Sequence, residues 1–179
     1  MSGGGSKGAY EVGGLWGLVK TDTDKSHFNW DVVTGVSAGS LNTAIVTGFA
    51  PGDEDAMVEY ASNLFQNTDN SGAYKMWPQG GIIYGITQES GMLDNEPAYN
   101  TVNKVIAELG TNKRKWVVSS VDANSGDYHL MNETLPRDEH ARAFVASTVI
   151  PAVFPHDVWN GATLMDGGTV WNTNLVSAI

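Results

Sequence analysis

Hydrophobic and polar positions follow two spacings along the chain, and they predict helices and strands in alternation. Apolar residues spaced three or four apart predict amphipathic helices at 9–20, 41–48, 57–65, 99–109 and 141–148. Short apolar, mostly β-branched runs predict strands at 30–33, 115–121, 128–131 and 162–165. This alternation predicts an α/β fold with a largely parallel central sheet flanked by helices. Residues 67–91 are rich in Gly, Asn and Ser, which indicates a long loop.

The stretch 34–40 joins the first predicted strand to the next helix and carries a serine at its centre. Gly35 and Gly39 flank Ser37 in the pattern G-x-S-x-G. A nucleophile on so tight a turn has a strained backbone, and flanking side chains would collide with the adjoining strand and helix. The helix start also directs free backbone N–H groups towards the serine. The alternative is an ordinary turn rich in small residues.

A second glycine-rich segment, residues 3–8, precedes the helix predicted at 9–20. Backbone N–H groups at a helix start can bind an anion. Gly3, Gly5 and Gly8 also match the dinucleotide pattern G-x-G-x-x-G. No predicted strand precedes them, so a dinucleotide site is not favoured. The segment is not a P-loop either, because glycine follows Lys7.

Composition and charge narrow the classes of function. The chain has 179 residues, enough for one domain with a sizeable core, and a net charge of −10. That charge argues against a general affinity for nucleic acid or anionic membranes. The absence of cysteine excludes thiol catalysis, disulfides and thiolate metal sites. The lack of cysteine, of a visible signal peptide and of an apolar run long enough to span a bilayer favours a cytoplasmic location without establishing it.

A serine nucleophile needs a base to accept its proton, and two candidates follow from the sequence. Ser37, Asp122 and His156 occur in the order of a hydrolase triad, although nothing typical surrounds the histidine. Asp166 is the better candidate, because it ends an apolar strand and precedes two glycines that permit close approach of a second segment. We expect Asp166 to be shielded from water, since desolvation makes a carboxylate more basic.

Four motifs together resemble the patatin-like phospholipases, and they occur in the family order. These are the loop at 3–8, the serine turn at 35–39, the segment 146–155, and Asp166-Gly167-Gly168. Residues 91–97 also resemble a family segment that leads into a helix. The resemblance spans nearly the whole chain and implies a three-layer patatin-like fold. It implies that residues 1–179 form a single catalytic domain, and that the first strand and a C-terminal remainder are missing.

The resemblance further implies a Ser–Asp dyad, with Ser37 as nucleophile and Asp166 as general base. It implies an oxyanion hole at Gly3, Gly4, Gly5 and Ser6, supported by Lys7, Gly8, Gly35, Gly39, Gly167 and Gly168. Lys7 is expected to cap or orient the loop. The implied reaction cleaves the acyl ester of a lipid or phospholipid through an acyl-enzyme, without metal or cofactor.

Two other functions remain open from the sequence. The same fold would serve as an inactive lipid-binding or scaffolding module, and the same serine would serve an acyltransferase. The apolar residues within 67–91 either meet a lipid-like substrate or pack onto the core. A transient contact with a membrane surface is compatible with the composition, whereas nucleic acid is not an expected partner.

Overall fold

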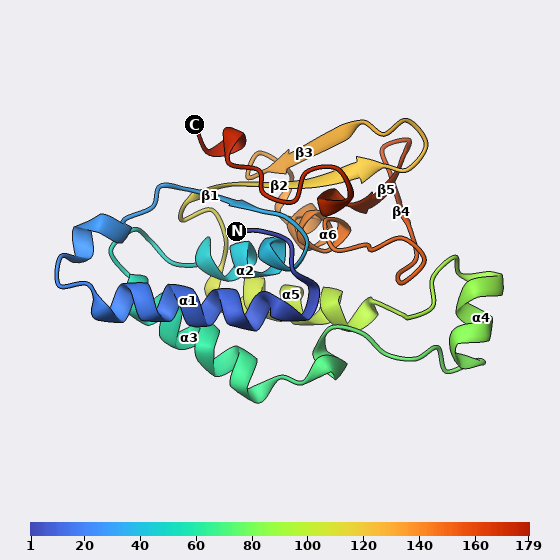
Figure 1. Ribbon diagram of the computed structural model, residues 1–179, viewed down its shortest axis with the longest axis horizontal. Coiled ribbons are helices and arrows are strands. Elements are labelled where there is room, and N and C mark those ends of the chain that lie inside the picture. Colours follow the sequence, from blue (N-terminus) through green and yellow to red (C-terminus); the bar gives the residue numbers. More distant parts are fainter.

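The computed structural model describes residues 1–179, apart from the side chains of Lys25 and Ser26, and has an α/β fold (Figure 1). Among the described residues, a five-stranded mixed sheet lies at the centre. Its strands are β1 (Val32–Gly35), β2 (Lys115–Asp122), β3 (Tyr128–Asn132), β4 (Asp157–Trp159) and β5 (Ala162–Asp166).

Strand β2 organises this sheet, because three of the other strands pair with it. Its first half pairs with β1 in parallel, and its second half pairs with β5 in antiparallel. Strand β3 pairs with the middle of β2, and β4 continues the sheet beyond β5. The prediction of a largely parallel sheet is therefore wrong: among the described strands, only the β1–β2 pairing is parallel. The short turns before β3 and β5 return the chain as hairpins, and hairpin strands are antiparallel.

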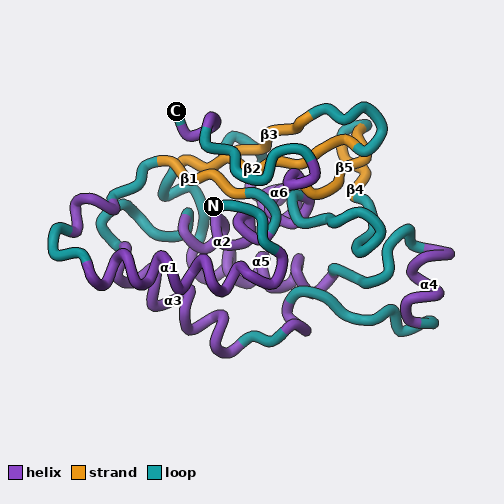
Figure 2. The backbone as a smooth tube through the Cα atoms, in the orientation of Figure 1, coloured by secondary structure: helices purple, strands orange, loops and turns teal.

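The larger helices gather on one side of the sheet, while the C-terminal segment follows the other side (Figures 1 and 2). They are α1 (Gly8–Thr21), α2 (Ala38–Val46), α3 (Glu54–Asn67), α4 (Gly81–Gln88), α5 (Glu96–Leu109) and α6 (His140–Ala146). Helices α2 and α6 contact the sheet, and α5 packs against both of them. In the main core, the rings of Trp116 and Phe144 lie 4.5 Å apart. No helix among the described residues is long and apolar enough to cross a bilayer.

Two elements were not predicted from the sequence. Residues 67–91, predicted to be a loop, contain α4, and the short strand β4 precedes β5. Helix α4 depends on a contact distant in sequence, because the indole N–H of Trp77 donates to the carbonyl of Gly91 (3.0 Å). So short a helix is marginal without tertiary packing, which explains why its local sequence carries little signal.

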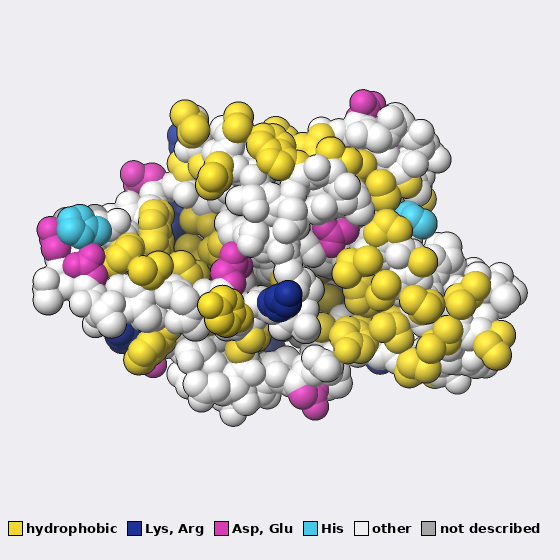
Figure 3. Space-filling view, in the orientation of Figure 1, with side chains coloured by type: hydrophobic (Ala, Val, Ile, Leu, Met, Phe, Trp, Pro, Cys, Tyr) yellow, Lys and Arg dark blue, Asp and Glu magenta, His cyan; other side chains and the backbone are white. Residues whose placement is uncertain are grey.

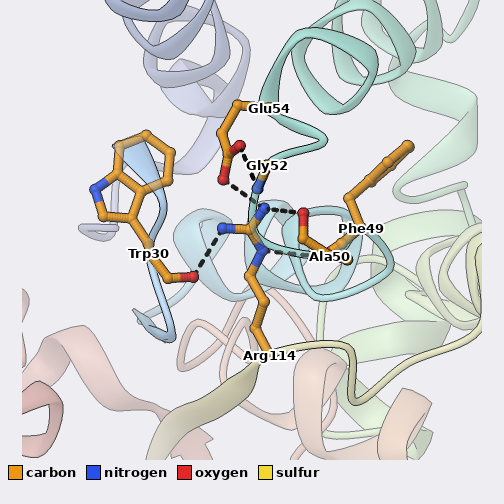
Figure 4. A network of polar contacts seen from close by, with 6 residues as sticks. All are labelled: Trp30, Phe49, Ala50, Gly52, Glu54 and Arg114. Atoms are coloured by element: carbon orange, nitrogen blue, oxygen red, sulfur yellow. Dashed lines mark hydrogen bonds and ion pairs between the residues drawn. The ribbon is translucent and has the colours of Figure 1, made fainter. Parts of the chain in front are cut away.

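A buried ionic network fixes both ends of the β1–α2 unit to the start of β2 (Figure 4). Arg114, immediately before β2, donates to the carbonyls of Phe49, Trp30 and Ala50 at 2.9, 2.8 and 2.8 Å. Its Nη2 also lies 2.7 Å from Glu54 Oε1, and both side chains are almost fully buried. Trp30 precedes β1 and Phe49 follows α2, so this network limits where the turn between them can lie.

Candidate active site

The pairing along β2 brings together two residues that are 129 positions apart in sequence. Strands β1 and β5 pair with successive halves of β2 and run in opposite directions, so their C-terminal ends meet. Ser37 follows the end of β1, and Asp166 is the last residue of β5. The Ser37 hydroxyl donates a hydrogen bond to Asp166 Oδ2 at 2.5 Å. Both residues are only 5% exposed.

The backbone at Ser37 adopts the strained conformation expected of the turn. Its φ of 54° and ψ of −127° lie outside the regions that residues with side chains favour. A Cβ at Gly35 would lie 2.5 Å from the carbonyl oxygen of Gly39, and one at Gly39 would lie 2.7 Å from that of Met1. These distances agree with the predicted steric need for glycine on both sides of the serine.

Ser147 supports the nucleophile's backbone, and this role was not predicted from the sequence. The N–H of Ser37 donates to Ser147 Oγ (2.9 Å), and the Ser147 hydroxyl donates to the carbonyl of Ser119 on β2 (2.6 Å). Ser147 therefore connects the strained turn to the central strand. The sequence placed Ser147 within a motif, but a hydroxyl that bridges two backbone groups leaves no local pattern.

Asp166 is shielded from water, as expected, and burial raises the pKa of its carboxyl. Hydrogen bonds from the Ser37 hydroxyl and the Gly168 N–H offset part of this effect. The Gly168 N–H donates to Oδ1 at 2.7 Å, which leaves Oδ2 to the serine. A Cβ at Gly167 would lie 2.4 Å from the Ser119 carbonyl oxygen, so glycine is needed for β5 to end against β2.

The glycine-rich loop lies beside Ser37, but its four predicted oxyanion residues are not equivalent. A Cβ at Gly3 would lie 3.0 Å from that of Ser37, which shows how closely the loop approaches. The Gly3 N–H donates to the carbonyl of Asn172 (3.1 Å), and is therefore not free to bind an oxyanion. This leaves Gly4, Gly5 and Ser6 as the candidate donors of the predicted oxyanion hole. Asn172 also donates its side-chain amide to the Gly3 carbonyl (3.0 Å), which fixes the loop beside the aspartate turn.

The residues that follow Gly3 in the loop have backbone N–H groups with no hydrogen-bond acceptor inside a helix. Gly4, Gly5 and Ser6 lie at the start of a 3-10 turn, Gly5–Lys7, that leads into α1. The first N–H groups of a helical segment lack intrahelical acceptors, and the same holds for Ala38 at the start of α2. Two helix starts therefore present unsatisfied donors near Ser37.

Lys7 and Gly8 complete the loop in different ways. The side chain of Lys7 is exposed and makes no capping hydrogen bond to α1. Its backbone N–H instead donates to the Gly4 carbonyl (3.1 Å). Gly8 is buried, and a Cβ there would lie 3.4 Å from that of Ala38. Small residues thus let α1 and α2 start close together.

The residues of the alternative triad serve elsewhere. The Asp122 carboxylate accepts hydrogen bonds from the Ser125 hydroxyl (2.9 Å) in the β2–β3 turn and from the Thr163 N–H (3.0 Å) on β5. His156 is partly exposed in the segment before β4. Among the described residues, no group of three or more His, Asp or Glu is arranged to hold a metal ion.

An apolar cavity of about 260 Å³ adjoins this site. Gly5, Ser6 and Ala38, the residue after Ser37, line one part of it. Helices α2, α3 and α5 supply most of the remaining wall, including Leu41, Phe65 and Val105. The unsatisfied N–H donors therefore lie next to a space suited to a hydrocarbon chain.

Comparisons with known proteins identify the family and the fold. The family model described as patatin-like phospholipase matches residues 1–179. Among solved structures, VipD from Legionella pneumophila is similar in fold, with a TM-score of 0.52 and 12% sequence identity. The match covers 96% of this chain and 46% of the VipD chain, so this chain spans less than half of that protein. No curated protein matches. The chain belongs to the patatin-like phospholipase family.

Proposed function

We propose that the protein is a serine lipid acyl hydrolase that cleaves the carboxyl esters of lipids or phospholipids. The observation that carries this proposal is the 2.5 Å hydrogen bond from the Ser37 hydroxyl to Asp166 Oδ2 in a buried site. An otherwise weak nucleophile gains reactivity when a positioned base accepts its proton. The adjoining cavity is apolar, which suggests that it binds the acyl chain of the substrate.

In the first half of the reaction, Ser37 Oγ attacks the ester carbonyl carbon while its proton passes to Asp166 Oδ2. The carbonyl oxygen becomes an oxyanion, which the N–H groups of Gly4, Gly5 and Ser6 would stabilise. One such donor typically contributes about 2.7–4 kcal/mol. Collapse of the intermediate breaks the ester C–O bond, the alcohol leaves with the proton from Asp166, and an acyl-serine remains.

In the second half, water attacks the acyl-serine. Asp166 accepts a proton from the water and then returns it to Ser37 Oγ, which releases the fatty acid. General acid–base catalysis of this kind typically accelerates a reaction about 10²–10⁴-fold. The Ser147 bridge holds Ser37 in the same position for both halves.

A fluorophosphonate probe tests whether Ser37 is activated. We expect the parent protein to be labelled rapidly at Ser37, because only a serine whose proton a positioned base accepts reacts readily with the probe. Mass spectrometry would locate the label. The matched control is Ser125→Ala, which removes an exposed serine and should leave labelling unchanged. Undiminished labelling of Ser37→Ala, or no labelling of the parent, would contradict the proposal.

The activity should also depend on the ionisation of Asp166. A protonated carboxyl cannot accept the serine proton, so kcat/KM should fall as the pH falls through the pKa of Asp166. Burial raises this pKa above its ordinary value of 3.8, so the midpoint of the acid limb should lie above pH 3.8. The measurement is the pH profile of kcat/KM on a soluble ester, with circular dichroism to show that the protein stays folded. A midpoint at or below pH 3.8 would contradict the role of Asp166 as base.

A further inference from the structure

Helix α4 carries an uncharged apolar surface that projects from the body of the protein (Figure 1). We define this surface, the apolar tip, as Met76, Ile82, Ile83 and Ile86. Ile83 is 77% exposed and Ile86 is 60% exposed. Ile86 lies four residues after Ile82 and three after Ile83, so both are its neighbours on the helix surface. Residues 76–88 contain no Asp, Glu, Lys or Arg.

The contacts that hold α4 in place do not involve the exposed isoleucines. Trp77 donates its indole N–H to the Gly91 carbonyl, and its ring lies 6.0 Å from that of Tyr84. A Cβ at Gly85 would lie 2.4 Å from the indole nitrogen, so the helix packs closely on Trp77. The isoleucines are therefore held outward by a framework that their replacement leaves intact.

A chain of hydrogen bonds connects α4 to the candidate active site. The N–H groups of Met92 and Leu93, just beyond α4, donate to the carbonyls of Ala152 and Val153 at 3.0 and 2.8 Å. The same loop contains Val149, whose carbonyl accepts a hydrogen bond from the Asp166 N–H (2.7 Å). Figure 3 shows hydrophobic side chains gathered over α4 and extending from it towards the centre of this face. The segment that follows α4 is therefore hydrogen-bonded to the same loop that contacts Asp166.

We propose that the apolar tip enters a zwitterionic phospholipid surface and holds the candidate active site at the lipid–water interface, an inference that rests on the proposed lipid hydrolase function. The net charge of −10 opposes binding to an anionic surface, whereas an uncharged tip meets no such repulsion at a zwitterionic one. Helix α4 has eight residues, too few to span a bilayer but enough to bury three isoleucines at its boundary. Trp77 and Tyr84 are of the aromatic type enriched at that depth.

Binding to vesicles tests this surface separately from catalysis. The Ser37→Ala protein, which should not hydrolyse lipid, is sedimented with phosphatidylcholine vesicles. We expect this protein to bind the vesicles. In the same background, Ile83→Asp with Ile86→Asp should lower the bound fraction at least about tenfold, because two apolar anchors are lost and charges are added. The matched control is Leu130→Asp with Leu175→Asp, which changes two leucines that are 54% and 64% exposed on other elements. This control should bind as Ser37→Ala does.

Activity on two kinds of substrate completes the test. With Ser37 intact, the α4 double variant should hydrolyse a soluble short-chain ester as the parent does but should lose activity on phosphatidylcholine vesicles. Equal vesicle binding by the α4 variant and its background would overturn the proposed surface. So would a dimer of the parent that dissociates when the isoleucines are changed, because the apolar tip would then bind a second copy of the chain. If the parent binds vesicles through α4 but cleaves neither substrate, the membrane surface stands and the hydrolase function fails.

Discussion

Replacement of Asp166 by asparagine is expected to lower kcat/KM on a soluble ester by about 10²–10⁴-fold. Asparagine is nearly the same size but cannot accept the proton that the Ser37 hydroxyl now directs at Asp166 Oδ2. Ser37→Ala should remove turnover through the acyl-enzyme, because no serine oxygen is left to carry the acyl group. Steady-state kinetics on a chromogenic ester would measure both effects. Activity of Asp166→Asn close to that of the parent would show that Asp166 is not the base.

Stability provides the control for this pair of variants. The folded-state pKa of Asp166 is raised by burial, so the native state binds more protons than the unfolded state between the two pKa values. The stability contribution of this group therefore falls as the pH rises through that window, and at pH 7 its ionised form costs stability. Asparagine is neutral, so Asp166→Asn should unfold at pH 7 at a temperature no lower than the parent does. A large decrease in Tm would mean that misfolding contributes to the lost activity.

Arg114→Ala is expected to lower the free energy of unfolding by about 3–5 kcal/mol. The variant leaves the Glu54 carboxylate, which Arg114 pairs at 2.7 Å, buried without its partner. It also removes the donors to three backbone carbonyls at the ends of the β1–α2 unit. Urea unfolding followed by circular dichroism would measure this loss. Because the same unit carries Ser37, partial unfolding near it should reduce fluorophosphonate labelling before the rest of the fold is lost.

The matched control for Arg114 is Arg142→Ala, which breaks a more exposed ion pair with Asp157. The Arg142 side chain is 37% exposed, so water and salt screen the pair, although the guanidinium also lies 5.0 Å from the Trp159 ring. This variant should lose about 1–2 kcal/mol. Equal decreases in the free energy of unfolding at the two positions would show that burial does not determine how much the Arg114 network contributes to stability.

Local features of the fold were predictable from the sequence because their causes are local. The need for glycine at position 35 is local, because a side chain there would meet the Gly39 carbonyl four residues on; at Gly39 the obstacle is the distant Met1 carbonyl, although the tight turn itself was predictable. Helix α5 was predicted at 99–109 from its apolar spacing, and its last residue, Leu109, is followed by Gly110 with a φ of 75°. The position of Asp166 at the end of an apolar strand was also predicted from the sequence, and so was its burial.

Features that depend on distant partners were not predictable in this way. Whether β5 runs parallel or antiparallel to β2 depends on how the preceding chain returns to the sheet, and periodicity alone carries no such information. Helix α4 depends on Trp77 reaching Gly91, and Ser147 acts through a hydroxyl that contacts two other segments. The Gly3 N–H matched the oxyanion pattern, yet Asn172, 169 residues away, accepts its hydrogen bond. In each case the residue type fits several environments, and only the tertiary contact selects one.

The end-to-end meeting of β1 and β5 along β2 makes the separation of Ser37 and Asp166 a matter of strand register. Neighbouring residues in a strand are about 3.3 Å apart and point to opposite faces. A slip of β5 by one residue would therefore carry the carboxylate beyond hydrogen-bonding reach and turn it to the wrong face. An insertion or deletion of one residue within either strand would be more damaging to this site than most changes inside it.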